Sequence, residues 1–164
     1  MSLYGLRNTS GYSPPLRGGE FEYQLPVVLW LLSIFVFSTD LFSTKQTGRI
    51  IIPVLMFLFP TISYEQTDFW HLVVRKSGHV TEYAVLAALA YRCFKNEHLS
   101  LSDTRIRTIA FVLVAALLDE WHQFFTAFRG ASIMDVGYDC LGAVWALGLI
   151  GVYETWRIRS HSIL

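Results

Sequence analysis

Four stretches of this chain are apolar enough, and long enough, to form helices that cross a membrane. They cover residues 25–42, 78–94, 106–125 and 133–156. The hydrocarbon core of a bilayer requires about 20 helical residues. The pattern therefore predicts an all-α fold, a polytopic membrane helix bundle with about four transmembrane helices.

A shorter apolar stretch lies between the first and second predicted spans. Residues 50–59 contain Pro53 and are followed directly by Pro60. This stretch is too short to cross a bilayer, so we expect a short re-entrant or interfacial helix there. Residues 65–74 predict a second short helix that leads into Arg75. If residues 50–60 crossed the membrane instead, the orientation of every later span would be reversed.

The polar segments at each end divide the chain into three parts. We predict a flexible tail over residues 1–24, the transmembrane domain over residues 25–156, and a short C-terminal tail over residues 157–164. A cleaved signal sequence has its apolar stretch close to the start of the chain. Here the apolar run begins only at Pro26, which favours an uncleaved first span.

The composition agrees with a membrane protein. The 164 residues are 53% hydrophobic and 16% charged, whereas soluble domains average about 25% charged residues. The net charge of zero argues against nucleic acid as a partner. Cys93 and Cys140 form no metal-binding spacing, so we interpret both as packing residues.

Three clusters of polar residues interrupt the predicted spans. Ionisable groups in hydrocarbon are costly, so each cluster is a hypothesis for a functional site. The first contains Arg75, Lys76, Ser77, Gly78, His79, Glu82 and Tyr83; the second contains Asp119, Glu120, His122 and Gln123; the third contains Arg129, Gly130, Ser132, Asp135 and Asp139.

The alternation of the spans predicts that these clusters meet. The second span begins, the third ends and the fourth begins on the same side of the membrane. The opposite side holds the larger number of basic residues, which favours the cytoplasm for that side and for both termini. The polar site would then face outward. The basic residues assigned to the cytoplasmic side are Arg7, Arg17, Arg92, Lys95, Arg105, Arg107, Arg157 and Arg159. Those assigned to the outer side are Lys45, Arg49, Arg75, Lys76 and Arg129.

The first cluster has the spacing of one helix face. Arg75, His79, Glu82 and Tyr83 are separated by intervals that bring their side chains together, and Gly78 would permit close approach of another group. A helix beginning there would add N–H donors that favour an anion. Two simpler interpretations stay open: the basic residues reach lipid headgroups, and His79 pairs with Glu82.

The other clusters follow the same pattern. Asp119, His122 and Gln123 share a face of the third span, although Asp119 and Glu120 would also suit a water-exposed helix end. On the fourth span, Ser132 is a candidate helix cap. Asp135 suits the helix dipole. Asp139 lies a turn deeper and requires a partner such as Arg75, His79 or Arg129. Arg129 offers a fork for phosphate or carboxylate, or a structural bridge to Asp135.

The chain resembles the VanZ-like family of bacterial membrane proteins, named for a teicoplanin-resistance factor. The resemblance rests on Arg-Lys-x-x-His-x-x-Glu-Tyr from Arg75, Asp-Glu-x-x-Gln from Asp119, and Arg-x-x-Ser-x-x-Asp-x-x-x-Asp-x-x-Gly from Arg129. It covers residues 25–153. It implies a multi-pass protein of the bacterial inner membrane that handles cell-envelope lipids or shields a lipid-linked target.

Two functions compete at the predicted site. In the first, the protein binds membrane lipid or a lipid-linked envelope precursor without catalysis. The ligand-binding candidates are Arg75, Lys76, His79, Glu82, Tyr83, Asp119, Glu120, His122, Gln123, Arg129, Ser132, Asp135 and Asp139. In the second, the protein is an enzyme that acts on lipid phosphates, with His79, Glu82, Asp119 and Asp139 as catalytic candidates for acid–base chemistry.

Other functions receive less support from the sequence. A metal site built from His79, Glu82 and His122 lacks the HExxH spacing, so we predict neither a metal nor another cofactor. A transporter with four spans would be small unless the chain formed a homo-oligomer.

Overall fold

The computed structural model describes residues 18–95, 97, 99–125 and 132–161. This part of the chain contains five α-helices, one 3₁₀ helix and no strand, which confirms the all-α prediction. The elements are α1 (Gly18–Phe37), η1 (Asp40–Phe42), α2 (Thr44–Leu58), α3 (Tyr64–Lys95), α4 (Leu101–Phe124) and α5 (Ile133–His161).

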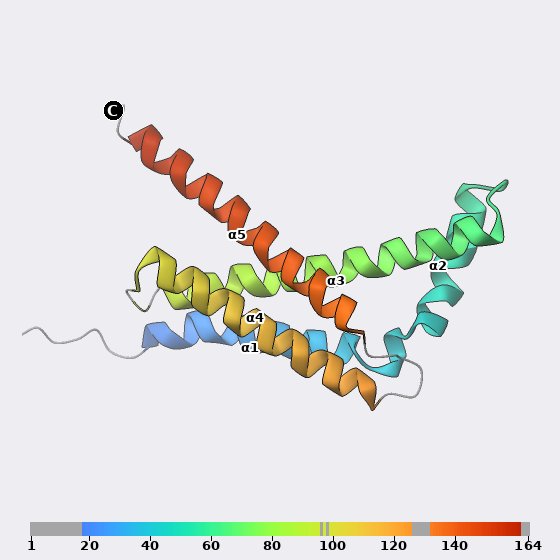
Figure 1. The fold of residues 1–164 in the computed structure, drawn as a ribbon, viewed down its shortest axis with the longest axis horizontal. Coiled ribbons are helices and arrows are strands. Elements are labelled where there is room, and N and C mark those ends of the chain that lie inside the picture. The colour runs from blue at the N-terminus through green and yellow to red at the C-terminus, as the bar shows by residue number, and fades with distance from the viewer. Residues whose placement is uncertain (1–17, 96, 98, 126–131, 162–164) are drawn as a thin grey trace, which may run out of the picture.

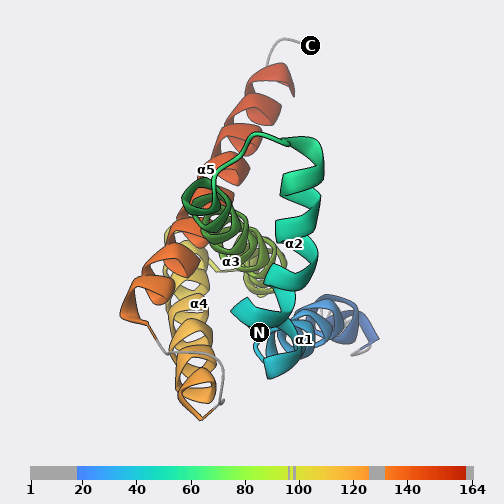
Figure 2. The same cartoon turned by 90° about the vertical axis from the view of Figure 1, so that its right-hand side faces the viewer.

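Helix α3 is the centre of the fold. It packs against α5, α4, α1 and α2, and the two ribbon views show it between these helices (Figures 1 and 2). The first part of α3 pairs with α2 and extends beyond the other three helices. The C-terminal half of α5 leaves the bundle in the opposite direction, so that α4 and α5 diverge.

Local capping sets where two of the helices begin. The Ser63 backbone N–H donates to Gln66 Oε1 at 3.0 Å, and the Gln66 N–H donates to Ser63 Oγ at 3.2 Å. This reciprocal arrangement is a capping box, and it starts α3 at Tyr64. At α4, the Asp103 N–H donates to Ser100 Oγ at 3.1 Å, which is the usual role of an N-cap serine.

The structure corrects several predicted boundaries. Residues 65–74 and the second predicted span form one continuous helix, α3, because no residue between them removes a helical hydrogen bond. Helix α1 begins at Gly18, so residues 18–24 are helical rather than part of a tail. It ends at Phe37, before the predicted limit of the first span at Phe42. Helix α5 continues to His161 and includes residues predicted for the C-terminal tail.

The short apolar stretch is helical, as predicted, and forms most of α2. Pro53 lies inside this helix. By length and composition, one helix within the described residues is suited to crossing a membrane, α5 over Ile133–Ser160. Residues Phe21–Phe37 and Asp40–Leu58 meet the same test only as a pair bent by 67°.

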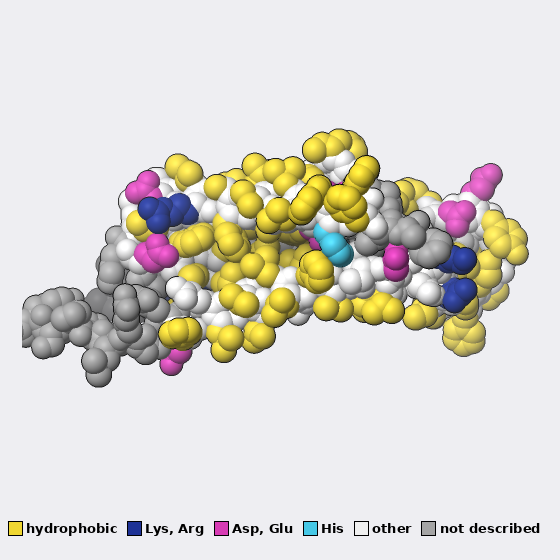
Figure 3. Space-filling view, turned by 90° about the horizontal axis from the view of Figure 1, so that it is seen from below, with side chains coloured by type: hydrophobic (Ala, Val, Ile, Leu, Met, Phe, Trp, Pro, Cys, Tyr) yellow, Lys and Arg dark blue, Asp and Glu magenta, His cyan; other side chains and the backbone are white. Residues whose placement is uncertain are grey.

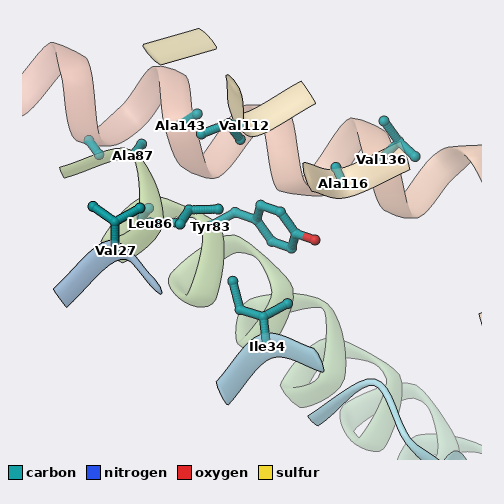
Figure 4. Close-up of a cluster of buried hydrophobic side chains, with 11 residues drawn as sticks. Val27, Ile34, Tyr83, Leu86, Ala87, Val112, Ala116, Val136 and Ala143 are labelled. Carbon is teal, nitrogen blue, oxygen red and sulfur yellow. The ribbon is translucent and has the colours of Figure 1, made fainter. Parts of the chain in front are cut away.

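The hydrophobic core is narrow and rich in small residues. Tyr83, Leu86 and Ala87 of α3 are fully buried, as are Val112 and Ala116 of α4. Figure 4 shows these side chains meeting Val27 and Ile34 of α1 and Val136 and Ala143 of α5. The small residues let the helices approach closely.

Large apolar side chains lie on the outside of the bundle. In α1, Leu29 and Leu32 are 54% and 57% exposed, and in α5, Val144 and Trp145 are 57% and 63% exposed. Figure 3 shows hydrophobic side chains over the middle of one face and charged side chains mostly toward its two ends. Soluble proteins rarely expose apolar surface this continuously.

Candidate functional site

A group of polar side chains is buried between four helices, at the end of the bundle where α4 ends and α5 begins. We refer to these residues as the polar cluster. Residue Ser38 follows α1, and the other members lie on α3, α4 and α5. The members are Ser38, His79, Tyr83, Asp119, Glu120, Gln123, Asp135 and Asp139, all of which are buried.

The contact between α3 and α5 places a histidine beside a carboxylate. His79 Nδ1 lies 3.2 Å from Asp139 Oδ1, and the Asp139 side chain is fully buried. Gly142, one turn further along α5, allows this approach, because a Cβ added there would lie 2.2 Å from the Val80 carbonyl oxygen. The second Asp139 oxygen, Oδ2, has no hydrogen-bond partner in the described part of the chain.

The two basic residues of α3 have separate partners. Lys76 forms an ion pair with Asp135 of α5, and its ammonium group lies 5.4 Å from the centre of the Tyr138 ring. Arg75 donates a hydrogen bond to the Thr44 hydroxyl at the start of α2. The basic side of the cluster is therefore partly neutralised by α5, and Arg75 connects it to α2.

The carboxylates of α4 are also held by hydrogen bonds. Asp119 accepts one from Ser38 Oγ and another from Gln123 Nε2, the latter at 2.8 Å. Glu120 Oε2 accepts a 2.6 Å hydrogen bond from the Ser132 backbone N–H, whereas Glu120 Oε1 has no partner among the described residues. Asp119 and Glu120 are both buried, so the interpretation of a water-exposed helix end is wrong.

Tyr83 of α3 is a fully buried member of the cluster. Its ring extends from α3 toward Ala116 in Figure 4. Its hydroxyl has no hydrogen-bond partner within the described ranges, although four carboxylates act on it electrostatically. Such an unpaired buried hydroxyl is costly and suits a site that receives a polar group from outside.

Two openings adjoin the polar cluster. A groove of about 420 Å³ runs between α1 and α4 along apolar side chains such as Leu31, Phe111 and Leu118, and reaches Tyr83 and Asp119. A second cavity, of about 250 Å³, lies between α1, α2 and α3 and is lined by residues that include Ser38, Thr47, Arg75, Gly78, His79 and Glu82. Asp119 lines the groove and Ser38 lines the cavity, and a hydrogen bond joins the two side chains.

The structure places most of the predicted site residues together. All of the cluster except Ser38 was predicted, and Arg75, Lys76 and Glu82 adjoin it. His122 instead faces the apolar groove, with its ring centre 4.3 Å from that of Phe35. Arg129 lies outside the described residues, as does Gly130.

Some expectations about individual residues are wrong. His79 pairs with Asp139 rather than with Glu82. No helix begins near Arg75, since α3 starts at Tyr64. An added Cβ at Gly78 would meet nothing within 4 Å. Gly78 lines the second cavity, so the group that this glycine would allow to approach is not another helix. Among the described residues, no group of three or more His, Cys, Asp and Glu side chains is arranged to hold a metal ion.

Sequence reasoning missed the contributions of α1 and α2. Ser38 and Thr44 bond to members of the predicted site, and Thr47 Oγ1 lies 3.1 Å from His71 Nε2. The Trp30 indole donates a 2.8 Å hydrogen bond to the Glu82 carbonyl oxygen. The signal available was a run of hydroxyl residues from Ser38 to Thr47, at the end of the first apolar stretch, where the sequence shows no cluster of ionisable side chains like the three found elsewhere.

The fold and the site define a class, a small helical bundle with buried ionisable residues at one end. The chain belongs to the VanZ/LLP1 family, whose family model matches residues 24–154. The match includes all members of the polar cluster. Comparisons with curated proteins and with solved structures gave no significant match.

Proposed function

We propose that this VanZ-type chain is a polytopic membrane protein of the bacterial cell envelope, with α1, α3, α4 and α5 each crossing the inner membrane once. The exposed apolar side chains of these helices support this arrangement, because they suit lipid as the surrounding medium. Lys76, His79 and Asp119, within α3 and α4, are turned inward to partners on other elements, as intramembrane ionisable groups usually are.

We propose that the polar cluster faces outward and that both termini are cytoplasmic. The support is the larger number of Lys and Arg that the sequence assigns to the side opposite the cluster, eight residues against five. In a variant with Cys93 and Cys140 replaced by Ala, a cysteine at Thr126, between α4 and α5, should react with an impermeant reagent on intact cells. Labelling only after the cells are opened, in a folded variant, would reverse the orientation.

The function that the site supports best is binding of a lipid or lipid-linked phosphate. The observation that carries this proposal is the apolar groove that ends at Tyr83 and Asp119. A groove of this kind suits a hydrocarbon chain, and its polar end suits a headgroup. Arg75, in the cavity beyond the Ser38–Asp119 contact, supplies a guanidinium group for phosphate. A protein that bound a lipid-linked precursor in this way would shield it, which is what a glycopeptide-resistance role of this kind requires.

Lipid binding can be tested on purified protein in detergent by native mass spectrometry. The probes are phosphatidic acid and a polyprenyl monophosphate, with phosphatidylcholine as the reference. Val114 lines the groove, whereas Ile106 lies on the outside of the same helix. We expect Val114→Trp and Arg75→Gln to weaken probe binding, and Ile106→Trp to leave it unchanged. Equal binding by all four proteins would refute the proposed site.

One observation favours an enzyme as the second candidate. The buried His79–Asp139 pair has the arrangement of a base and the carboxylate that orients it. Release of inorganic phosphate from the same probes, abolished in His79→Gln, would select the enzyme. Binding without phosphate release would select the non-catalytic function.

A further inference from the structure

A separate opening lies at the end of the bundle opposite the polar cluster, where α4 and α5 diverge. It has a volume of about 760 Å³, and apolar side chains that include Ile109, Val144 and Leu147 form its walls. The lining also includes Arg105, Trp156 and Arg159. An adjoining cavity of about 590 Å³ shares Arg105 and Gly151 and adds Lys95 and Arg157. We call the two together the α4–α5 groove.

Arg105 occupies a position over a glycine. A Cβ added at Gly151 would lie 3.2 Å from Arg105 Nη2, so the guanidinium group lies against α5 at Gly151. The nearby acid is Glu154, whose two oxygens accept hydrogen bonds from Tyr91 Oη at 3.0 and 3.1 Å. Lys95 also bonds to Glu154.

The charge at this opening is therefore unbalanced. Glu154 pairs with Lys95 and accepts hydrogen bonds from Tyr91. Arg105 makes no salt bridge with any described residue. Arg105 acts on Glu154 only at longer range. A cationic entrance above apolar walls is complementary to an amphiphile with a negative headgroup.

We propose that the α4–α5 groove binds an anionic phospholipid of the surrounding membrane. The Arg105 guanidinium would bond to the phosphate oxygens, in the geometry that arginine offers to phosphate. An acyl chain would lie along Ile109, Val144 and Leu147, and Trp156 would lie at the level of the headgroups. Basic openings between membrane helices on the cytoplasmic side are a known form of lipid recognition.

This inference rests on the proposed membrane placement but is independent of the ligand of the polar cluster. The two sites lie at opposite ends of α5, since Asp135 and Asp139 are in its first turns and Gly151 and Trp156 are near its end. Variants at one end therefore leave the other end's residues intact, and each site can fail without the other.

The test measures stabilisation of the full-length protein by phosphatidylglycerol in a neutral detergent, with phosphatidylcholine and soluble glycerol phosphate as separate arms. We expect Arg105→Gln to weaken phosphatidylglycerol binding about fivefold. Gly148→Leu should weaken it as well, because Gly148 lines the groove and an added Cβ there meets nothing within 4 Å.

The matched control is Arg92→Gln. Arg92 is a cation at the same end of the bundle, stacked 5.0 Å from the Tyr23 ring centre and outside the groove. Wild-type binding by Arg92→Gln, with a loss in Arg105→Gln and Gly148→Leu, supports the proposal. The proposal is overturned if Arg105→Gln behaves like Arg92→Gln, or if phosphatidylcholine or glycerol phosphate replaces phosphatidylglycerol.

Discussion

At the end of the bundle where α4 ends and α5 begins, charged side chains are buried and bond to other helices; at the opposite end they are largely exposed. Asp135 and Asp139 are 5% and 0% exposed. The Arg107 and Glu97 side chains, which pair at 3.3 Å at the opposite end, are 55% and 46% exposed. Both ends carry charged side chains, but only the end with the polar cluster buries them.

This difference separates two uses of charge. Breaking a buried ion pair is strongly destabilising, at about 3–5 kcal/mol, whereas an exposed pair contributes about 0–1 kcal/mol. Residues of the polar cluster are therefore tied to the packing of four helices. The exposed charges at the other end are free to interact with solvent, headgroups or a bound lipid.

The largest expected effect comes from the helix crossing that supports the polar cluster. Gly142→Ala should destabilise the protein by about 3 kcal/mol or more, because the added methyl group would meet the backbone of α3 rather than a flexible side chain. The measurement is the free energy of unfolding in mixed micelles. Gly137→Ala is the control, since a Cβ there meets nothing within 4 Å. Equal stability of the two variants would contradict the close α3–α5 contact.

A smaller loss is expected from the hydrogen bond that joins α1 to the cluster. Ser38→Ala should reduce the free energy of unfolding by about 1.5–3 kcal/mol, since it removes a donor to the buried Asp119 carboxylate. Ser33→Ala is the matched change, because Ser33 Oγ bonds only within its own helix, to the Leu29 carbonyl oxygen at 3.0 Å. If both variants lose the same stability, Ser38 has no special role in the cluster.

Neutralising the deep carboxylates should affect ligand binding more than stability. Asp139→Asn and Glu82→Gln keep volume but remove charge, and a charge within a span costs about 2.5–3.5 kcal/mol on insertion scales. We expect lipid-phosphate binding to fall about tenfold, which corresponds to about 1.4 kcal/mol. Stability should be unchanged or raised, because each amide can keep a hydrogen bond to its neighbours while one buried charge is removed. Glu97→Gln, at the exposed end, is the control. Unchanged binding in both cluster variants would assign these carboxylates to packing.

The smallest effect is expected at the exposed pair. Arg107→Gln should change the free energy of unfolding by less than about 1 kcal/mol, because its partner Glu97 is exposed to solvent. The same micelle assay, run at low and high salt, measures it. A loss as large as that of Ser38→Ala would remove the contrast between the two ends.

Much of the helical order and the meeting of the clusters could be predicted from the sequence. Alternation of the apolar stretches was sufficient to bring His79, Asp119 and Asp139 to one end, because that inference depends only on the order of helices. The depth of Asp139 correctly indicated that it needed a partner, and His79 was among the candidates named.

The particular partners depend on features that the pattern does not carry. Whether His79 pairs with Glu82 or Asp139 is decided by the rotation of α3 against α5, which the Gly142 contact fixes. The start of α3 was misplaced because the charged residues at 75–79 resemble a helix beginning. The Ser63–Gln66 capping box, which begins twelve residues before Arg75, lies outside the apolar pattern.

The distance along the chain between paired residues bears on how the protein is made. Lys76 and His79 in α3 bond to side chains of α5 that lie 59 and 60 residues later. At a synthesis rate of about 5–20 residues per second, those partners emerge roughly 3–12 s after α3. Under the proposed membrane placement, Lys76 and His79 would therefore lack their α5 partners during that interval.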